Sequence, residues 1–271
     1  MMLTIENLNK VFNAGTVNEV KALDSIHCEV EEGSFVALLG TNGSGKSTLL
    51  NAVAGSFLPD TGKIILDGMD ITRYPEHKRA RYIGRVFQNP FTGTAPDMSI
   101  AENLTLASKR GMKRGLQTAL KAGSIHFFRE KIKQLNMGLE DRLGSPIGKL
   151  SGGQRQALTL LMATWHKPKL LLLDEHTAAL DPKTANKVIQ LTQEVITRDH
   201  LTTLMVTHSM QQAVNLGERI LMMHNGRIVH DFKEDEKRRL QARDLVALFD
   251  EIRRKDQIDA SMAEMIEKNY V

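Results

Sequence analysis

The stretch Gly40-Thr41-Asn42-Gly43-Ser44-Gly45-Lys46-Ser47 decides the fold of this chain. It follows the apolar residues 35–39, which predict a strand, and it leads into a helix predicted to reach about Ala54. The spacing G-x-x-x-x-G-K-S is that of a phosphate-binding loop, whose glycines let consecutive backbone N–H groups surround an anion at a helix N-terminus. An ordinary glycine-rich turn is the alternative, and the strand and helix on either side argue against it.

Two residues of this loop carry the chemistry. We expect Lys46 to reach the β- and γ-phosphates of ATP and Ser47 to hold Mg²⁺. The predicted ATP contacts are the loop and the next residue, namely Gly40, Thr41, Asn42, Gly43, Ser44, Gly45, Lys46, Ser47 and Thr48. Such a loop by itself identifies only a nucleotide-binding protein.

Residues 169–175 read Lys-Leu-Leu-Leu-Leu-Asp-Glu, and the four consecutive leucines favour a strand buried on both faces of a parallel sheet. At the end of this strand, Asp174 is placed to bind Mg²⁺ directly or through water. Glu175 can polarise a water molecule for in-line attack on the γ-phosphorus. An Asp-Glu pair at a strand end is common, so this motif is informative only together with the loop.

Residues 150–154, Leu-Ser-Gly-Gly-Gln, form a second glycine-rich helix start, which we call the signature segment. Ser151 and the amides of Gly152 and Gly153 precede a helix predicted to run from Gln154 to Trp165, so another set of N–H donors points at an anion. One chain does not plausibly wrap both sets around the same phosphate. The simplest arrangement is two copies head to tail, each covering the γ-phosphate of the other. A plain helix N-cap explains the shape of the segment but not the order of the motifs.

With these three motifs in this order, residues 1 to about 232 resemble the ATP-binding subunit of an ATP-binding cassette (ABC) transporter. Four further positions match the family pattern. Gln88 resembles the glutamine that touches Mg²⁺ and the attacking water, and His208 resembles the switch histidine that contacts the γ-phosphate. Asp181 resembles the end of the loop that links the two active sites, and Phe12 resembles the aromatic residue that stacks on adenine.

The resemblance implies an α/β fold, with a P-loop NTPase core of mostly parallel sheet, an antiparallel β part near the N-terminus and an inserted α-helical subdomain. It implies catalytic roles for Lys46, Gln88, Glu175 and His208. The implied Mg²⁺ ligands are Ser47, Gln88 and Asp174, and the implied ATP contacts from a second copy are Ser151, Gly152, Gly153, Gln154 and Asp181. His176 and Thr41 depart from the usual family residues, but no essential residue is missing, so an active enzyme is expected.

Simpler roles remain open for three of these residues. Phe12 could be a core aromatic residue, and His208 could be a solvated or capping histidine at a strand end. Gln88, beside Asn89-Pro90, could be only a turn residue.

The predicted organisation is an ATPase core over 1–89 and 166–232, a helical subdomain with the signature segment over 90–165, and a C-terminal helical tail over 233–271. Strands are predicted at 3–8, 26–30, 35–39, 63–66 and 82–87, again from 170, 202 and 220, and in a hairpin through Asn225-Gly226 into 227–230. Helices are predicted at 99–109, 124–135 and 154–165. The tail places Leu245, Leu248, Phe249 and Ile252 at helical spacing, so we expect it to pack back on the core, with a dimer contact as the alternative.

Composition agrees with this organisation. The chain has 271 residues, of which 41% are hydrophobic, and one cysteine, so it can bury an α/β core and cannot form an internal disulfide. No apolar stretch approaches the roughly 20 residues that span a bilayer. Residues 109–133 carry eight basic residues and one acid within a chain of net charge +4. This basic segment could be a solvated helical face or could face the anionic inner leaflet; no accompanying motif favours nucleic acid as a partner.

Together these features predict an ATPase that powers import of a small solute, such as an amino acid or related compound. We expect it to act as a peripheral subunit on the cytoplasmic face of the cell membrane, with a separate permease and a solute-binding protein. An ABC exporter and a non-transport ABC ATPase are the alternatives. A small-molecule kinase would need the phosphate loop but not the signature segment.

Overall fold

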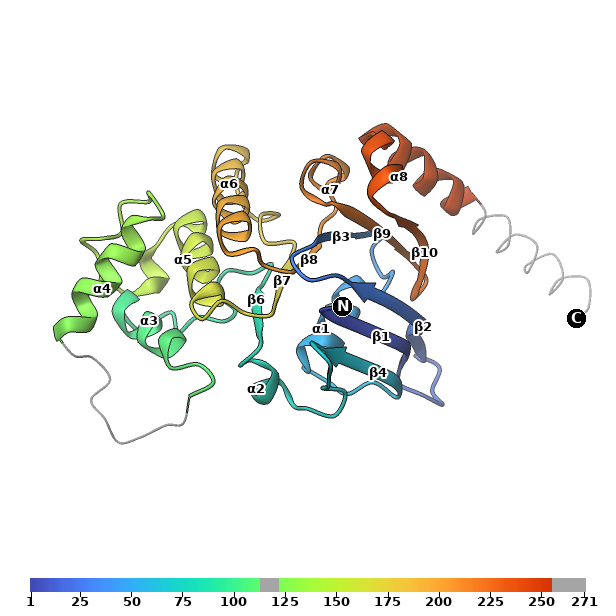
Figure 1. The fold of residues 1–271 in the computed structure, drawn as a ribbon, viewed down its shortest axis with the longest axis horizontal. Coiled ribbons are helices and arrows are strands. Elements are labelled where there is room, and N and C mark those ends of the chain that lie inside the picture. Colours follow the sequence, from blue (N-terminus) through green and yellow to red (C-terminus); the bar gives the residue numbers. More distant parts are fainter. Residues whose placement is uncertain (113–121, 255–271) are drawn as a thin grey trace, which may run out of the picture.

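The computed structural model describes residues 1–112 and 122–254, which form two β-sheets with helices packed around them (Figure 1). Three positions of the basic segment lie outside the described residues, namely Lys113, Arg114 and Lys121. Residues 255–271 of the predicted tail also lie outside them.

The larger sheet has six strands in the order β10-β9-β3-β8-β7-β6. Every neighbouring pair from β9 to β6 is parallel, and β10 is antiparallel to β9. Asn225 and Gly226 both have positive φ, as a tight hairpin turn requires, so the predicted hairpin is confirmed. The strands are β3 (Phe35–Gly40), β6 (Ile83–Val86), β7 (Leu170–Asp174), β8 (Thr203–Val206), β9 (Arg219–His224) and β10 (Arg227–Phe232).

The smaller sheet is antiparallel, as predicted, and has the order β2-β1-β4-β5. Its strands are β1 (Leu3–Phe12), β2 (Val20–Val30), β4 (Thr61–Leu66) and β5 (Met69–Asp70). β1 and β2 are longer than the sequence pattern predicts, because their polar, exposed ends still pair across register shifts between Leu8 and Val11. Backbone pairing therefore extends beyond the apolar residues that mark the strands.

The three helices predicted in the middle of the chain are confirmed as α3 (Ile100–Ser108), α4 (Ala122–Lys133) and α5 (Gly152–Thr164). Ser99 begins α3 with a capping box to Glu102. A short 3-10 turn, η1 (Ile147–Lys149), precedes α5, and α1 (Lys46–Ala54) follows the phosphate loop. Helices whose bounds the sequence pattern did not give are α2 (Glu76–Arg79), α6 (Pro182–Asp199), α7 (Met210–Leu216) and α8 (Glu234–Arg239).

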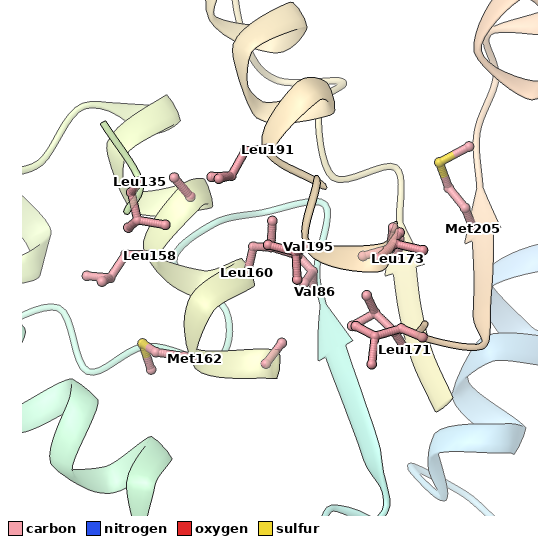
Figure 2. Close-up of a cluster of buried hydrophobic side chains, with 14 of the residues drawn as sticks. Val86, Leu135, Leu158, Leu160, Met162, Leu171, Leu173, Leu191, Val195 and Met205 are labelled. Carbon is pink, nitrogen blue, oxygen red and sulfur yellow. The ribbon is translucent and has the colours of Figure 1, made fainter. Parts of the chain in front are cut away.

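Two hydrophobic cores cover the two faces of the larger sheet. Leu171 and Leu173 of β7 point to the core formed with α5 and α6 (Figure 2), whereas Leu170 and Leu172 point to the core that contains α1 and the smaller sheet. All four side chains are fully buried, which confirms the strand predicted to be covered on both faces.

The described residues between 90 and 165 form helices and loops and contain none of the named strands. Their apolar side chains join the same core as β6 and β7, since Leu158 and Leu160 of α5 lie in one cluster with Val86 and Leu171 (Figure 2). The helical region and the sheet therefore share one packed core, and the predicted domain boundaries remain predictions.

The structure shows where part of the tail and one residue of the basic segment lie. Residues 242–254 are helical, and Leu245 and Phe249 are buried in the same hydrophobic core as Ala213 of α7, so this part of the tail packs back as expected. Arg110 is not on a solvated face, because its guanidinium donates to the Ala163 carbonyl at 2.7 Å and is largely desolvated. Among residues 1–112 and 122–254, no helix combines the length and apolar character that a bilayer crossing requires.

Candidate active site

The phosphate loop joins the C-terminal end of β3 to the N-terminus of α1 (Figure 1). At two positions of the loop, neighbouring backbone atoms leave no room for a side chain, so glycine is required. A Cβ on Gly45, whose φ is 97°, would lie 2.4 Å from the Ala22 carbonyl, and one on Gly40 would lie 2.5 Å from the Met223 carbonyl. Strands β2 and β9 therefore hold the loop from outside, and only glycine fits at these points.

Lys46 lies inside the loop and is 5% exposed. Its Nζ donates to the carbonyls of Gly40 at 2.9 Å and Thr41 at 2.8 Å. Burial lowers the pKa of Lys46, and the nearby carboxylates of Glu175 and Asp174 oppose that shift. The loop thus holds a cation at its base, as phosphate binding requires.

Asp174 ends β7 beside the start of α1. Its Oδ1 accepts from the Ser47 hydroxyl at 3.4 Å, and its Oδ2 lies 3.5 Å from the guanidinium of Arg85. A hydroxyl and a carboxylate are hard oxygen donors of the kind that Mg²⁺ takes, together with phosphate oxygens and waters. Ser47 and Asp174 therefore provide the kind of ligands that the predicted Mg²⁺ would need.

Glu175, the next residue, is contacted from two neighbouring strand ends. Its Oε1 lies 2.5 Å from Nε2 of His208, and its Oε2 accepts from Nε2 of Gln88 at 3.2 Å. The Glu175 side chain is 9% exposed, and its backbone has a φ of 45° in the left-handed region. This conformation is costly for a residue with a Cβ, and such strain is typical of active sites.

The sheet explains why these residues meet. Parallel pairing puts Val86 beside Leu173 and Asp174 beside Val206, so the chain leaves β6, β7 and β8 at the same edge. Gln88, Glu175 and His208 lie within two residues of those three strand ends. The structure brings six predicted site residues to this edge, which we call the catalytic edge: Lys46, Ser47, Gln88, Asp174, Glu175 and His208.

Phe12 ends β1 on the surface and is 36% exposed. Its ring makes an edge contact with Phe57 at a centroid distance of 5.4 Å, and the Lys10 ammonium lies 5.5 Å from its centroid. The core alternative for Phe12 is therefore wrong. Stacking on adenine remains a prediction.

The side chains of the signature segment cap the helix that the segment begins. Ser151 is exposed and caps α5, accepting from the Gln154 amide, while the Gln154 side chain accepts from the Ser151 amide and donates to the Met137 carbonyl at 3.1 Å. Gly152 faces Leu180, and a Cβ on Gly153 would lie 2.0 Å from the Thr184 side chain. In the described part of the chain, none of these contacts reaches the catalytic edge.

Asp181 has a local role that the sequence analysis missed. It caps α6 by accepting from the Thr184 amide at 3.1 Å, and hydrogen bonding to Thr184 lowers its pKa. The signal was present in the sequence, because an acid before Pro182 is a typical helix start. The predicted contact of Asp181 with a partner's ATP remains a prediction.

Two further residues lie behind the site, and their contacts were not predicted from the sequence. His176 is buried, its Nε2 lies 3.1 Å from the Thr192 hydroxyl, and burial lowers its pKa to about 4. Arg85 lies beside Asp174, although the sequence pattern shows it only as part of a strand. A charged residue within a strand of a buried sheet is the signal that could have found it.

Known proteins resemble this chain in sequence and in fold. The ABC transporter family profile matches residues 23–178. The chain is 41% identical to a tyrosine transport ATP-binding protein of Clostridioides difficile, over 92% of this chain and 99% of that protein. It is 34% identical to a methionine import ATP-binding protein of Corynebacterium diphtheriae, over 84% of this chain and 64% of that one.

A solved structure of similar fold is an ATP-binding cassette dimer in a post-hydrolysis state, bound to ADP and Pi. It has 29% sequence identity and a TM-score of 0.73, over 86% of this chain and 99% of that chain. The family profile covers more than half of this chain, and the Clostridioides difficile relative matches it over nearly its full length. The chain belongs to the ABC transporter family, as an ATP-binding subunit that hydrolyses ATP.

Proposed function

We propose that Glu175 is the base that activates water and that Gln88 and His208 hold it. The observation that carries this proposal is the pair of contacts to the two oxygens of Glu175, at 2.5 Å from His208 and 3.2 Å from Gln88. Each oxygen of Glu175 contacts a different side chain, so rotation of the carboxylate would break at least one of the two contacts. A base fixed in this way loses little orientational freedom when it accepts a proton from water.

Lys46 binds and orients the phosphates from inside the loop, where its ammonium already lies among carbonyl groups. Ser47 and Asp174 would hold Mg²⁺, with Gln88 as a third donor from the neighbouring strand end. When bound, Mg²⁺ neutralises charge on the phosphate oxygens. The imidazole of His208 is 46% exposed, so it can reach a phosphate above the pocket as well as Glu175.

The second half of the proposed site comes from another copy of this chain. Ser151 is exposed at a helix N-terminus, and its contacts lie within its own helix, so the start of α5 is available to an anion outside the chain. We place the signature segment of each copy, with Asp181, over the ATP held by the other copy. The dimeric cassette of similar fold supports this arrangement.

The decisive variant is Ser151→Asp. Aspartate is as good an N-cap as serine, so α5 should keep its start, but its charge would face the γ-phosphate of the partner's ATP. We expect at least about a tenfold loss of ATPase activity, with the thermal unfolding midpoint unchanged. Wild-type ATPase activity in this variant would contradict the composite site.

Mixing two inactive variants gives a matched control. In a mixed dimer of Lys46→Ala and Ser151→Asp, one site carries both defects and the other carries neither. Equal mixing should therefore restore about a quarter of wild-type activity if subunits pair at random and each site works alone. Each variant mixed with itself should stay inactive.

For the transported solute, we propose import of an amino acid or related compound, with an aromatic amino acid as the first candidate. The full-length relative in Clostridioides difficile supports this choice, since it is named for tyrosine transport. The chain would act at the cytoplasmic face of the membrane through a separate permease, with a solute-binding protein on the other side. Co-purification with a polytopic membrane protein, and ATPase activity stimulated by tyrosine and its binding protein in proteoliposomes, would test this. Stimulation only by an unrelated solute would reject the aromatic amino acid.

A further inference from the structure

Arg85 is a cation with a mostly buried side chain behind the catalytic edge. It lies on β6 opposite Leu172 of β7, so its side chain shares the sheet face that α1 covers. The side chain is 12% exposed, and its guanidinium donates to the Asn51 side chain at 2.6 Å and the Ser56 hydroxyl at 3.2 Å. These two bonds fix the guanidinium against the end of α1.

The same guanidinium faces Asp174. It lies 3.5 Å from Oδ2, whereas the other oxygen of that carboxylate, Oδ1, lies 3.4 Å from the Ser47 hydroxyl. The two oxygens of Asp174 therefore have different neighbours, a fixed cation on one side and the nucleotide pocket on the other. A carboxylate held on one side cannot rotate freely, so its free oxygen keeps one direction.

Arg85 also contacts the strand end that leads to Gln88. Its guanidinium stacks on Phe87 at 4.4 Å from the ring centroid, and Gln88 is the next residue. One side chain thus contacts the element before Gln88, the helix after the phosphate loop and the carboxylate of Asp174. Burial lowers the pKa of Arg85, and the charge of Asp174 opposes this shift, so the acid compensates part of the cost of burying the cation.

We propose that Arg85 is a positioning residue that holds Asp174 with Oδ1 toward Ser47 and thereby sets the affinity of the nucleotide site for its divalent cation. This inference rests on the proposed Mg²⁺ site. Residues that orient a metal ligand typically change metal affinity by about 10- to 100-fold when they are replaced.

The test measures cation binding without turnover. In a Glu175→Gln background with saturating ATP, Mn²⁺ is titrated and its free concentration is followed by electron paramagnetic resonance. We expect Arg85→Gln to weaken Mn²⁺ binding by about tenfold or more, and Arg85→Lys, which keeps the charge but loses the planar fork, to have a smaller effect. ATP affinity without metal should change by less than the metal affinity.

Arg79 supplies the matched control. It is also a buried arginine against the end of α1, donating to the carbonyls of Ala52 and Val53, but its hydrogen bonds do not involve Asp174. Arg79→Lys should lower the unfolding midpoint and leave Mn²⁺ affinity unchanged. If Arg79→Lys weakens Mn²⁺ binding as much as Arg85→Lys, the weaker binding comes from a general loss of stability, and the proposal is wrong.

Failure of the proposed role of Arg85 can be distinguished from failure of the proposed cation site. Unchanged Mn²⁺ affinity in Arg85→Gln would overturn the role of Arg85 while leaving the cation site intact, and if that variant does not fold, Arg85→Lys decides in the same way. If the parent protein binds no Mn²⁺ with ATP, the proposed cation site fails, and the inference fails with it.

Discussion

The catalytic edge and the signature segment, for which we propose contact with a partner's ATP, are built in opposite ways. At the catalytic edge, side chains from distant parts of the sequence contact one another, as Gln88, Glu175 and His208 do. In the signature segment, Ser151 and Gln154 bond to each other, and the two glycines pack against Leu180 and Thr184, around the start of α6. The first region is assembled within one copy, whereas the second is a preformed surface.

The difference follows from the sheet. Parallel strands end at one edge, so residues that follow them meet in one pocket. A helix N-terminus has N–H groups that the helix backbone cannot satisfy, and at the start of α5 the exposed Ser151 caps one of them. Variants at the catalytic edge should therefore change the rate of ATP hydrolysis, whereas variants at Gly153 and Gln154, which contact other parts of the same chain, should also change stability.

The largest expected effect is that of Glu175→Gln. Removal of a general base typically costs about 10² to 10⁴ in rate, while ATP binding should remain. Phosphate release measures the rate, and light scattering with ATP should show a persistent dimer. Hydrolysis within a few-fold of wild type would mean that another group activates the water.

His176, which lies behind the catalytic edge, should make the free energy of unfolding depend on pH. In the folded protein its pKa is about 4, compared with 6.5 for an unperturbed histidine. Between these values the unfolded chain binds more protons, so the free energy of unfolding should fall by about 3 kcal/mol as the pH falls from 6.5 to 4. His176→Gln should remove this part of the slope in urea unfolding when it is compared with the wild-type protein. Equal slopes for His176→Gln and the wild-type protein would show that His176 does not titrate as its burial implies.

Gly153→Ala tests the packing of the signature helix. The added Cβ would lie 2.0 Å from the Thr184 side chain, and overpacking of this kind costs about 1 to 3 kcal/mol. Unfolding in urea measures the loss. Gly153→Ala with Thr184→Ser, which removes the contacted methyl group, should recover part of it. No loss in the single variant would show that α5 and α6 can move apart.

Gln154→Ala should have the smallest effect, about 1 kcal/mol or less of unfolding free energy, because it removes one cap bond and one bond to the Met137 carbonyl. Gln154→Glu keeps the capping box but loses the donor to Met137, so it should lie between wild type and alanine. Activity measured beside stability sharpens the comparison. A large ATPase loss in Gln154→Ala at unchanged stability would indicate a role outside its own helix.

Much of this site could be predicted from the sequence. Gly40 to Ser47, Asp174-Glu175 and residues 150–154 are local motifs, and local spacing determines a phosphate loop, a strand end and a helix start. The hairpin at Asn225-Gly226 and the burial of Leu170 to Leu173 were predictable for the same reason. In each case the residues that matter are neighbours in the chain.

The contacts of Arg85, His176 and Asp181 were not predicted, and the first two depend on residues far away in the sequence. Arg85 meets Asn51 and Asp174, which are 34 and 89 positions away, and its isolated charge within a strand gives no partner. His176 is buried only because α6 packs over it and brings Thr192 into contact. Such contacts arise from strand order and helix packing.

By itself, the sequence determined the chemistry available to this protein: a loop for phosphate, two acids after a buried strand and a capped helix for a second anion contact. The tertiary structure decided which of these groups meet. It brought Gln88 and His208 into contact with Glu175, because parallel pairing gathers strand ends at one edge, and it left Ser151 exposed, with its side-chain bonds inside its own helix.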